Sequence, residues 1–363
     1  MGSVVSTYGV LHRNFGFSTQ AVRTLALFQI RWLWNQLTGG IDHALYPQFQ
    51  GLAIDRPVFV LGNPRSGTTL MHRFLANAEP LCAFELWEML FPAISARKLL
   101  RPLIERFANS GRAVQSEEAK KIHETGLKYA ETDDAFLLMQ LLDGPLYWGA
   151  VQAWEPSFAG DFMSEPFQKL CEQRFYPALE AAWRKNLFLK QRPRILVKSS
   201  AVSASMPRLL QRHPDARLIY MMRSPLEVIP STLSLLEHNY VQPLSRVRTP
   251  TAEQRQRYFE HTYLMQCELY RRFHEERTAG LLPARNLKLV SYRRLMQSFA
   301  AEMGAVLDFI EVPQAQLAAQ IAEHASRQRQ HKSKHRYSLE QYGLTEARVR
   351  RDLDFVFDNY DVE

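Results

Sequence analysis

Cysteine is scarce in this sequence: Cys82, Cys171 and Cys267 are the three in 363 residues, and they lie far apart. Without a CxxC pair, the chain has neither the pattern of a disulfide framework nor that of a zinc site. Free thiols of this kind are typical of a reducing compartment. We therefore expect a cytoplasmic protein that holds no metal.

Long apolar runs are also missing. No stretch reaches the roughly 18 apolar residues that a membrane-spanning helix needs. The N-terminus lacks the charged segment, apolar segment and cleavage site of a secretory signal. No internal repeat or low-complexity tract is present, and the 46% hydrophobic content is typical of a globular chain.

Acidic residues are outnumbered by basic ones, 37 against 45, which gives a formal net charge of +8. An excess of positive charge favours an anionic ligand or partner, either a nucleic acid or a small polyanion. The basic residues are dispersed and no stacking motif interleaves with them, so we expect no nucleic-acid partner.

Four short apolar runs have the length and composition of buried strands. Helical segments separate or follow them, and this alternation predicts an α/β fold with a mostly parallel sheet and helices on both faces. The predicted strands span 57–62, 194–199, 217–222 and 286–292, and the predicted helices span 68–78, 166–184, 203–212, 225–237 and 252–279.

A helical extension over residues 1–50 is expected to precede this domain, which then covers residues 51–363. Residues 19–38 have helical periodicity and begin with a Ser/Thr cap. The apolar stripe of this helix is Leu25, Leu27, Ile30, Trp32 and Leu37. The simplest interpretation packs the stripe on the main domain. The alternative is a peripheral contact with a membrane, or with a second copy in a homodimer.

The loop GNPRSGTTL, which begins at Gly62, has the spacing of a phosphate-binding loop. Between a strand and a helix, the backbone N–H groups of such a turn surround an anion. Thr68, however, stands where a nucleoside triphosphatase carries its lysine. Two strands end in Lys198 and Arg223, where an acid would hold Mg²⁺. The sequence thus predicts an anion site that uses cationic side chains and no metal.

A second anion-binding signal begins at Arg223, the residue that ends a predicted strand. Ser224 and Pro225 then start a helix as its cap and its first helical residue. Ser231 lies close enough along this helix to meet the same anion. A guanidinium beside a hydroxyl is favourable chemistry for binding phosphate.

These two signals together resemble the two cofactor signatures of the sulfotransferases, over about residues 55 to 345. The segments FELWEML, ETDDAFLL and HKSKHRYSLEQYGL make the resemblance closest to the bacterial-type branch. The resemblance implies a donor, 3′-phosphoadenosine 5′-phosphosulfate, and a product, adenosine 3′,5′-bisphosphate, bound without metal. Two alternatives stay open: a P-loop kinase with a degenerate lysine, and a nucleotide-binding protein that has lost catalysis.

The resemblance also implies roles for individual residues. Arg223 and Ser231 would grip the 3′-phosphate, and Tyr292 would lie near the adenosine. The residues that it places on the phosphosulfate are Arg65, Ser66, Gly67, Thr68 and Thr69.

A basic stretch, residues 327–336, resembles the C-terminal loop that closes over the 3′-phosphate. Lys332, Lys334 or His335 would make the contact there. His331 and His335 have i, i+4 spacing, but lysines surround them and no carboxylate accompanies them, so we expect no metal there.

Sulfuryl transfer needs charge neutralised on the leaving oxygen and a proton taken from the acceptor. Arg65, Lys198 and the loop N–H groups can meet the first need. The histidines that serve the second in family members are replaced here by Ser200 and Val202. The resemblance then points to Glu85, at a position where related members place a glutamate base.

Phe84 and Trp87 flank Glu85, and an apolar environment raises the pKa of a carboxyl group. Glu88 is the second candidate for the base, followed by His72 and His123.

Aromatic residues are concentrated between the two signatures, where the family builds its acceptor pocket. They predict a hydrophobic small-molecule acceptor (an alcohol, phenol, lipid or natural product), although core packing accounts for at least half of them. The aromatic residues concerned are Phe84, Trp87, Phe91, Phe136, Tyr147, Trp148, Trp154, Phe158 and Phe162.

Overall fold

The computed structural model describes residues 2–109, 126–131, 133–138, 151–158, 165–199, 205–245, 248–328 and 338–363. The contacts within the chain divide it into two compact units. Unit 1 contains residues 1–54, 83–191 and 235–262, and unit 2 contains residues 55–82, 192–234 and 263–363. The boundary expected after residue 50 stays a prediction.

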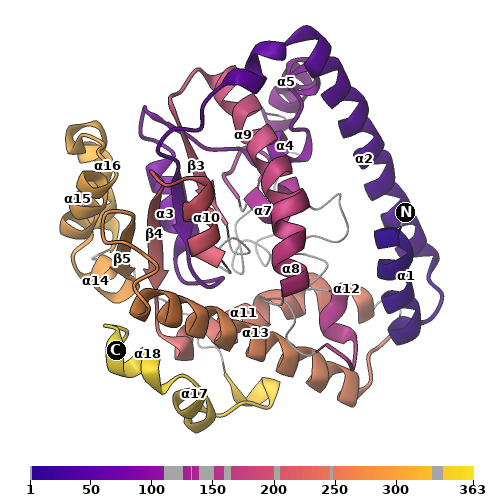
Figure 1. The fold of residues 1–363 in the computed structure, drawn as a ribbon. Coiled ribbons are helices and arrows are strands. Elements are labelled where there is room, and N and C mark those ends of the chain that lie inside the picture. Colours follow the sequence, from indigo (N-terminus) through magenta and orange to yellow (C-terminus); the bar gives the residue numbers. More distant parts are fainter. Residues whose placement is uncertain are drawn as a thin grey trace. The chain divides into compact units, whose positions relative to one another are not determined.

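Unit 2 contains a five-stranded sheet in which all neighbouring strands are parallel, in the order β2-β3-β1-β4-β5 (Figure 1). The strands are β1 (Val58–Leu61), β2 (Leu81–Cys82), β3 (Arg194–Lys198), β4 (Arg217–Met222) and β5 (Leu287–Ser291). The α/β prediction is therefore confirmed. Four strands match their predicted bounds to within one residue, whereas β2 is too short to give an apolar run.

Helices cover both faces of this sheet. The connection through α3 leads from β1 towards β2, whereas the connection through α10 leads from β3 across β1 to β4. Such crossovers between parallel strands are right-handed. Since these two connections run in opposite directions along the sheet, α3 and α10 lie on opposite faces. All four residues of β1 are accordingly buried.

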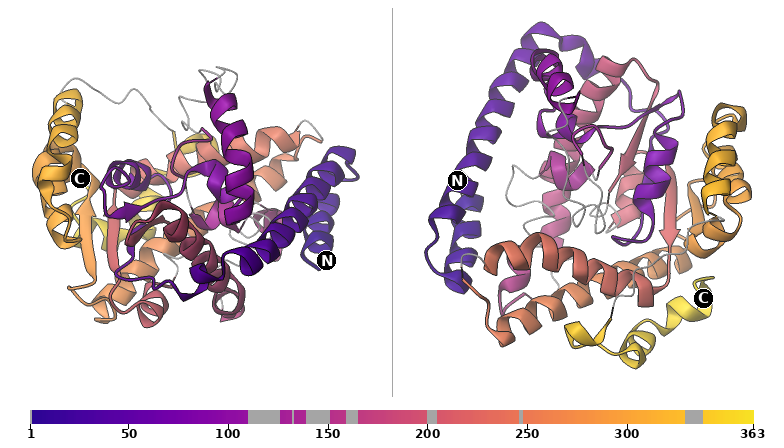
Figure 2. Two further views of the ribbon diagram at one scale, coloured as in Figure 1. Left: turned by 90° about the horizontal axis from the view of Figure 1, so that it is seen from above. Right: turned by 180° about the vertical axis from the view of Figure 1, so that it is seen from behind.

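Further helices follow the last strands of unit 2, and α14 and α15 pack beside β5 (Figures 1 and 2). Two of the helices, α11 and α13, also include residues of unit 1. The helical elements are α3 (Thr68–Leu75), α10 (Met206–Arg212), α11 (Pro225–Leu236), α13 (Ala252–Thr278), α14 (Tyr292–Gln297), α15 (Phe299–Phe309), η9 (Gln314–Leu317), α16 (Ala318–Gln328), η10 (Glu340–Tyr342), α17 (Glu346–Asp352) and α18 (Asp354–Asn359).

The elements described in unit 1 are helical. They are α1 (Gly2–Phe15), α2 (Thr19–Leu45), η1 (Pro47–Gly51), α4 (Leu86–Leu90), α5 (Ile94–Asn109), α7 (Asp133–Leu137), η4 (Gln152–Trp154), α8 (Glu165–Leu170), η6 (Cys171–Phe175), α9 (Tyr176–Lys190), η8 (Glu237–Val241) and α12 (Gln242–Ser245). The predicted helix at 166–184 is thus α8, a π-helical turn (η6) and α9.

The predicted helix at residues 19–38 is present as the longer α2, but its apolar stripe does not pack as expected. Leu25 is buried, whereas Leu27, Ile30 and Leu37 are each more than 60% exposed. The interpretation that the stripe packs on the main domain is therefore wrong for these three residues.

A buried carboxyl group lies in the part of α13 that belongs to unit 2. Glu276 is 7% exposed, and its Oε2 atom has no hydrogen-bond partner in the described structure. Burial raises the pKa of Glu276 to about 8, although Arg272 and the Met206 N–H act in the opposite direction. The folded state therefore prefers the protonated form of this side chain.

We expect Glu276 to make the protein less stable as the pH rises. Its pKa is higher in the folded state than in the unfolded state, so the folded state holds the extra proton and loses this advantage between about pH 4.5 and pH 8. Glu276→Gln removes the titration and should raise the melting temperature at pH 8 by a few degrees, with a smaller effect at pH 5. Thermal unfolding across this range tests it, and an unchanged pH slope would contradict it.

Candidate functional site

Candidate site residues lie at the carboxyl ends of four strands of unit 2. The glycine loop follows β1, Lys198 is the last residue of β3, Arg223 follows β4, and Tyr292 follows β5. In an open parallel sheet, ligands bind beside the carboxyl ends of the strands. The sheet thus brings together residues that are more than 200 positions apart in the sequence.

Two glycines of the loop occupy positions where a side chain does not fit. Gly62 has φ 133°, and a Cβ atom there would lie 2.7 Å from the Met221 carbonyl oxygen. Gly67 has φ 100°, and a Cβ atom there would lie 2.5 Å from Cδ2 of the Tyr292 ring. The loop backbone therefore packs directly against β4 and Tyr292, as a close phosphate cradle requires.

Arg65 connects the loop to the second predicted signature. Its backbone has φ 71°, an uncommon conformation for a residue with a side chain. Its Nε atom donates a hydrogen bond to Ser231 Oγ at 3.0 Å, and its carbonyl oxygen accepts one from Arg223 Nη1 at 3.0 Å. The two signatures, predicted separately, thus contact each other directly.

The Arg223 guanidinium group is held on several sides. Its Cζ atom lies 4.2 Å from the centre of the Tyr292 ring, a cation–π geometry. Its Nε atom donates to Glu227 at 2.8 Å, one helical turn along α11. The Arg223 carbonyl accepts a hydrogen bond from the Tyr270 hydroxyl at 2.8 Å. Helix α11 begins at Pro225, as predicted.

The start of α3 carries the remaining loop residues, Thr68 and Thr69, next to the buried Lys198. The Lys198 ammonium group is nearly inaccessible and donates to Thr69 Oγ1 at 3.0 Å. Ser66 is fully buried, and its hydroxyl has no hydrogen-bond partner in the described structure. A buried ammonium group and an unpaired hydroxyl are groups that an anion in the loop could satisfy.

Two further side chains brace the loop and were not predicted. The Thr232 hydroxyl donates to the Pro64 carbonyl at 3.1 Å. Asn63 donates through its side-chain amide to the carbonyl oxygen and to Oε1 of Gln266, at 3.0 and 3.1 Å. Thr232 and Asn63 adjoin predicted residues in the sequence, but no sequence pattern marks Gln266.

The two glutamate candidates for the base lie in unit 1, at the start of α4, whereas the histidine candidate His72 is fully buried in α3 of unit 2. Glu85 is half-buried, and its Oε2 atom accepts a hydrogen bond from Trp87 Nε1 at 2.8 Å. Glu88 is buried and forms ion pairs with Arg97 and, at 2.7 Å, with Lys190. The Glu88 carboxylate is thus paired with two cationic side chains, whereas the Glu85 carboxylate accepts its hydrogen bond from the neutral indole of Trp87.

Several predicted residues lie outside the described residues. They are His123, Tyr147, Trp148, Phe162, Ser200, Val202, His331, Lys332, Lys334 and His335. Among the described aromatic residues between the signatures, Phe84, Trp87, Trp154 and Phe158 are buried, and Trp154 stacks on Tyr258 at 4.2 Å. These four belong to the core of unit 1, as the packing interpretation allows.

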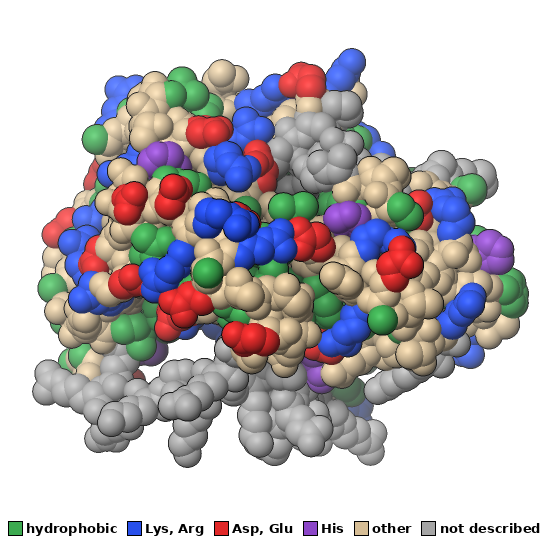
Figure 3. Space-filling view, turned by 90° about the horizontal axis from the view of Figure 1, so that it is seen from below, with side chains coloured by type: hydrophobic (Ala, Val, Ile, Leu, Met, Phe, Trp, Pro, Cys, Tyr) green, Lys and Arg blue, Asp and Glu red, His purple; other side chains and the backbone are tan. Residues whose placement is uncertain are grey.

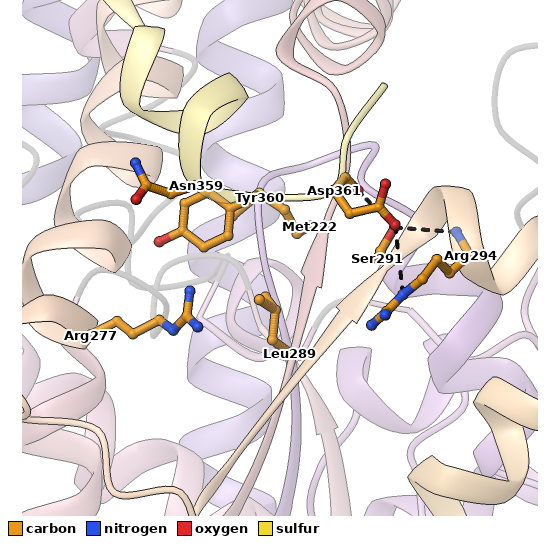
Figure 4. Close-up of a pocket in the computed structure, with 8 residues that line it drawn as sticks. All are labelled: Met222, Arg277, Leu289, Ser291, Arg294, Asn359, Tyr360 and Asp361. Atoms are coloured by element: carbon orange, nitrogen blue, oxygen red, sulfur yellow. Dashed lines mark hydrogen bonds and ion pairs between the residues drawn. The ribbon is translucent and has the colours of Figure 1, made fainter.

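A pocket of about 120 Å³ lies between β4, β5 and the C-terminal residues, and Ser291 is one of the residues that line it (Figure 4). Ser291 donates to the Asp361 carbonyl at 2.8 Å, and Arg294 lies 3.7 Å from the Asp361 carboxylate. Ligand pockets usually enclose about 300–1,000 Å³. The pocket is therefore too small for a nucleotide, and its contacts anchor the C-terminus to the sheet.

In the described part of the chain, no group of three His, Cys, Asp or Glu side chains is placed to hold a metal ion. No helix there is long and apolar enough to cross a bilayer. On the face in Figure 3, the described basic side chains are interspersed with acidic ones. This mixed surface is consistent with the absence of a nucleic-acid partner, which stays a prediction, as do the cytoplasmic location and the homodimer.

Comparisons with known proteins agree on one family. A model of the sulfotransferase family matches residues 57–316. An omega-hydroxy-beta-dihydromenaquinone-9 sulfotransferase (Stf3) from Mycobacterium bovis is 25% identical over 253 residues, which is 68% of this chain and 59% of the relative. The Stf3 protein from Mycobacterium tuberculosis matches equally well. This chain thus spans less than two thirds of the length of these relatives.

Two solved structures share the fold. The sulfotransferase STF1 from Mycobacterium tuberculosis aligns with a TM-score of 0.69 at 18% identity, covering 96% of this chain and 91% of that one. The sulfotransferase STF9 from Mycobacterium avium also has a TM-score of 0.69 at 18% identity, covering 90% and 82%.

We expect Gly67→Ala to destabilise the protein by about 1–3 kcal/mol, because the new Cβ atom meets Tyr292 and the backbone has positive φ. The matched control is Gly40→Ala in α2, where a Cβ atom meets nothing within 4 Å. This substitution should be neutral or stabilise by up to about 1 kcal/mol. Chemical unfolding of both variants measures the difference, and equal stabilities would show that the loop is not packed as described.

Proposed function

Because this chain belongs to the sulfotransferase family, we propose that it transfers a sulfuryl group from 3′-phosphoadenosine 5′-phosphosulfate to a hydroxyl group of a hydrophobic small molecule. One observation carries the proposal: Arg223 donates to the carbonyl oxygen of Arg65, which lies 158 residues away. This contact joins the loop and the second signature into one cationic site. Family membership also argues against the alternative of a P-loop kinase.

The loop and its surroundings fit such a donor. The unpaired hydroxyl of buried Ser66 and the N–H groups at the start of α3 suit the phosphosulfate group. Arg223 and Ser231 suit the 3′-phosphate, and Tyr292 suits the adenosine. The present hydrogen bond between Arg65 and Ser231 joins side chains assigned to different phosphates. Binding would exchange it for charge-assisted bonds to anionic oxygens, which are stronger.

The donor, when bound, supplies the sulfuryl group and a phosphate leaving group. Arg65 and Lys198 would offset the negative charge that grows on the leaving oxygen. Lys198 is suited to this because β3 fixes its backbone and Thr69 fixes its ammonium group at 3.0 Å. The same proposal assigns to Lys332 and Lys334 the contacts with the 3′-phosphate from the C-terminal loop.

Glu85 is the proposed base that takes the proton from the acceptor hydroxyl. The Trp87 Nε1–H group holds one of its carboxylate oxygens and thereby fixes the orientation of the side chain. The neighbouring Glu88 is already paired with Arg97 and Lys190. A buried carboxylate in two ion pairs is a poor base, since protonation would leave its partners without a counter-charge.

The acceptor is proposed to be a hydrophobic alcohol of the lipid or natural-product kind. The names of the Stf3 relatives give a hydroxylated menaquinone as the molecule that they sulfate. Phe91 and Phe136 are half-buried in this chain, unlike the four aromatic side chains in the core. Among the described members of the aromatic set between the two signatures, these two remain accessible to an acceptor.

Adenosine 3′,5′-bisphosphate should raise the melting temperature without added metal, because it stabilises the folded state by about 2.7 kcal/mol at a free ligand concentration of 100 Kd. Arg223→Gln should abolish most of this shift, because it removes a contact with the 3′-phosphate. The matched control is Arg271→Gln, which also loses a helical ion pair, with Glu268. Differential scanning fluorimetry measures the shifts, and a shift with ATP and Mg²⁺ alone would refute the donor assignment.

Glu85→Gln should lower kcat by about 10²–10⁴-fold with an active acceptor alcohol, the usual contribution of a general base. The bisphosphate shift should persist, since the substitution leaves the donor site intact. Glu253→Gln, at an 88% exposed side chain, serves as the control and should keep full activity. If Glu85→Gln turns over as fast as the parent protein, another residue takes the proton.

A further inference from the structure

Helix α2 exposes its apolar side chains to solvent over nearly its whole length. Eight large apolar residues are between 38% and 68% exposed on the outer side of this 27-residue helix. We call them the α2 apolar face: Val22, Leu27, Ile30, Leu33, Trp34, Leu37, Ile41 and Leu45. Exposed patches of this size on a folded chain mark an interaction surface.

The inner side of the C-terminal half of α2 is polar instead. Asn35, Thr38 and Asp42 follow one another at helical spacing and are all buried. Asp42 is fully buried, accepts hydrogen bonds from the backbone N–H groups of Ile94 and Ser95 at 2.7 and 2.8 Å, and pairs with Lys185 at 3.0 Å. These bonds fix the rotation of α2, so its apolar face points outwards because polar contacts hold it there.

The dimensions of the α2 apolar face suit a flat surface. From Val22 to Leu45 it extends over about 35 Å, at 1.5 Å per residue. At about 100° per residue its members spread over an arc of about 140°, which is wider than the seam of a two-stranded coiled coil. A helix with so broad an apolar arc lies well in the interface of a bilayer.

The charges near this face are complementary to anionic lipid. The one acidic residue of α2 is the buried Asp42, whereas Arg23 is exposed among the apolar residues. Lys98 lies beside the C-terminal end of α2, with its Nζ atom 4.2 Å from the centre of the Tyr46 ring. Cations next to an apolar face attract anionic headgroups.

Helix α5, which packs against α2, repeats the pattern. Leu99, Leu103 and Phe107 occur every four residues and are each at least 45% exposed. Arg106 lies beside this row and is also exposed, whereas Arg101, on the other side of α5, pairs with Glu105 at 3.0 Å. A second row of exposed apolar side chains, with Arg106 beside it, thus lies on a helix that contacts α2.

We propose that unit 1 binds the surface of an anionic lipid bilayer through the α2 apolar face. No described helix can cross a bilayer, so α2 lies along the surface rather than spanning it. The inference stands on exposure and charge, and it needs no sulfuryl transfer. If the acceptor is lipid-like, as in the proposed function, the protein would encounter it at that bilayer surface.

A second copy of the chain is the other occupant that the spacing allows. Leu27, Ile30, Trp34, Leu37 and Ile41 recur at alternating intervals of three and four residues, as in a coiled coil. The broad arc, the exposed Arg23 within it and the added row on α5 favour the bilayer. The experiment below separates the two.

Flotation with vesicles tests the proposal on the full chain, without donor or acceptor. Binding should be strong to vesicles of phosphatidylcholine with 30% phosphatidylglycerol and at least about tenfold weaker to phosphatidylcholine alone. The double variant Ile30→Gln/Leu37→Gln should lower the partition coefficient at least about tenfold, because it removes buried apolar area from the interface. Leu264→Gln/Leu281→Gln, at exposed leucines of unit 2, is the matched control and should bind as the parent does.

Two results would overturn the proposal. One is a parent protein that does not float with anionic vesicles. The other is a dimer in analytical ultracentrifugation that Ile30→Gln/Leu37→Gln dissociates, which would assign the face to a second copy. The bisphosphate shift of the same variants is measured in parallel. A retained shift with lost flotation supports the membrane surface, and a missing shift in the parent refutes only the proposed donor.

Discussion

The hydrogen bond from Arg223 to the carbonyl oxygen of Arg65 is the contact on which the site depends. It can form because β1 and β4 are adjacent and parallel, so that both segments leave the sheet at the same edge. The stacking of Arg223 on Tyr292, and of Tyr292 against Gly67, then closes the arrangement from the side of β5. Three strands thus place one guanidinium group, and a shift in any of them would move it.

This arrangement gathers cationic side chains at one edge of the sheet before any anion arrives. Lys198 is buried at the end of β3, and Arg65 and Arg223 are linked through a carbonyl oxygen. Part of the repulsion is offset by Glu227, which pairs with Arg223 at 2.8 Å. Glu227 is itself 57% exposed, so solvent weakens this pair. An anion in the loop would relieve the remaining repulsion, and the site gains affinity from it.

The sequence was informative where the pattern is local. The four longer strands, the turn after β1 and the start of α11 at Pro225 each follow from neighbouring residues, and the structure confirms them. Long-range contacts have no such signal: Gln266 braces Asn63 from a helix about 200 residues away. The distinction between Glu85 and Glu88 likewise depends on Arg97 and Lys190, whose positions only folding reveals.

Helix α2 shows a different limit of sequence patterns. Periodicity identifies two sides of a helix, and burial of the apolar side is assumed because it is favourable in water. In α2 the buried Asp42 carboxylate has three partners, namely two backbone N–H groups and the Lys185 ammonium group, so the polar side can be buried at little cost. The apolar side is then left exposed to water, which is unfavourable in free energy, and binding to a partner surface would remove this apolar area from water. The pattern thus predicts the helix correctly, and its polar contacts decide which side faces outwards.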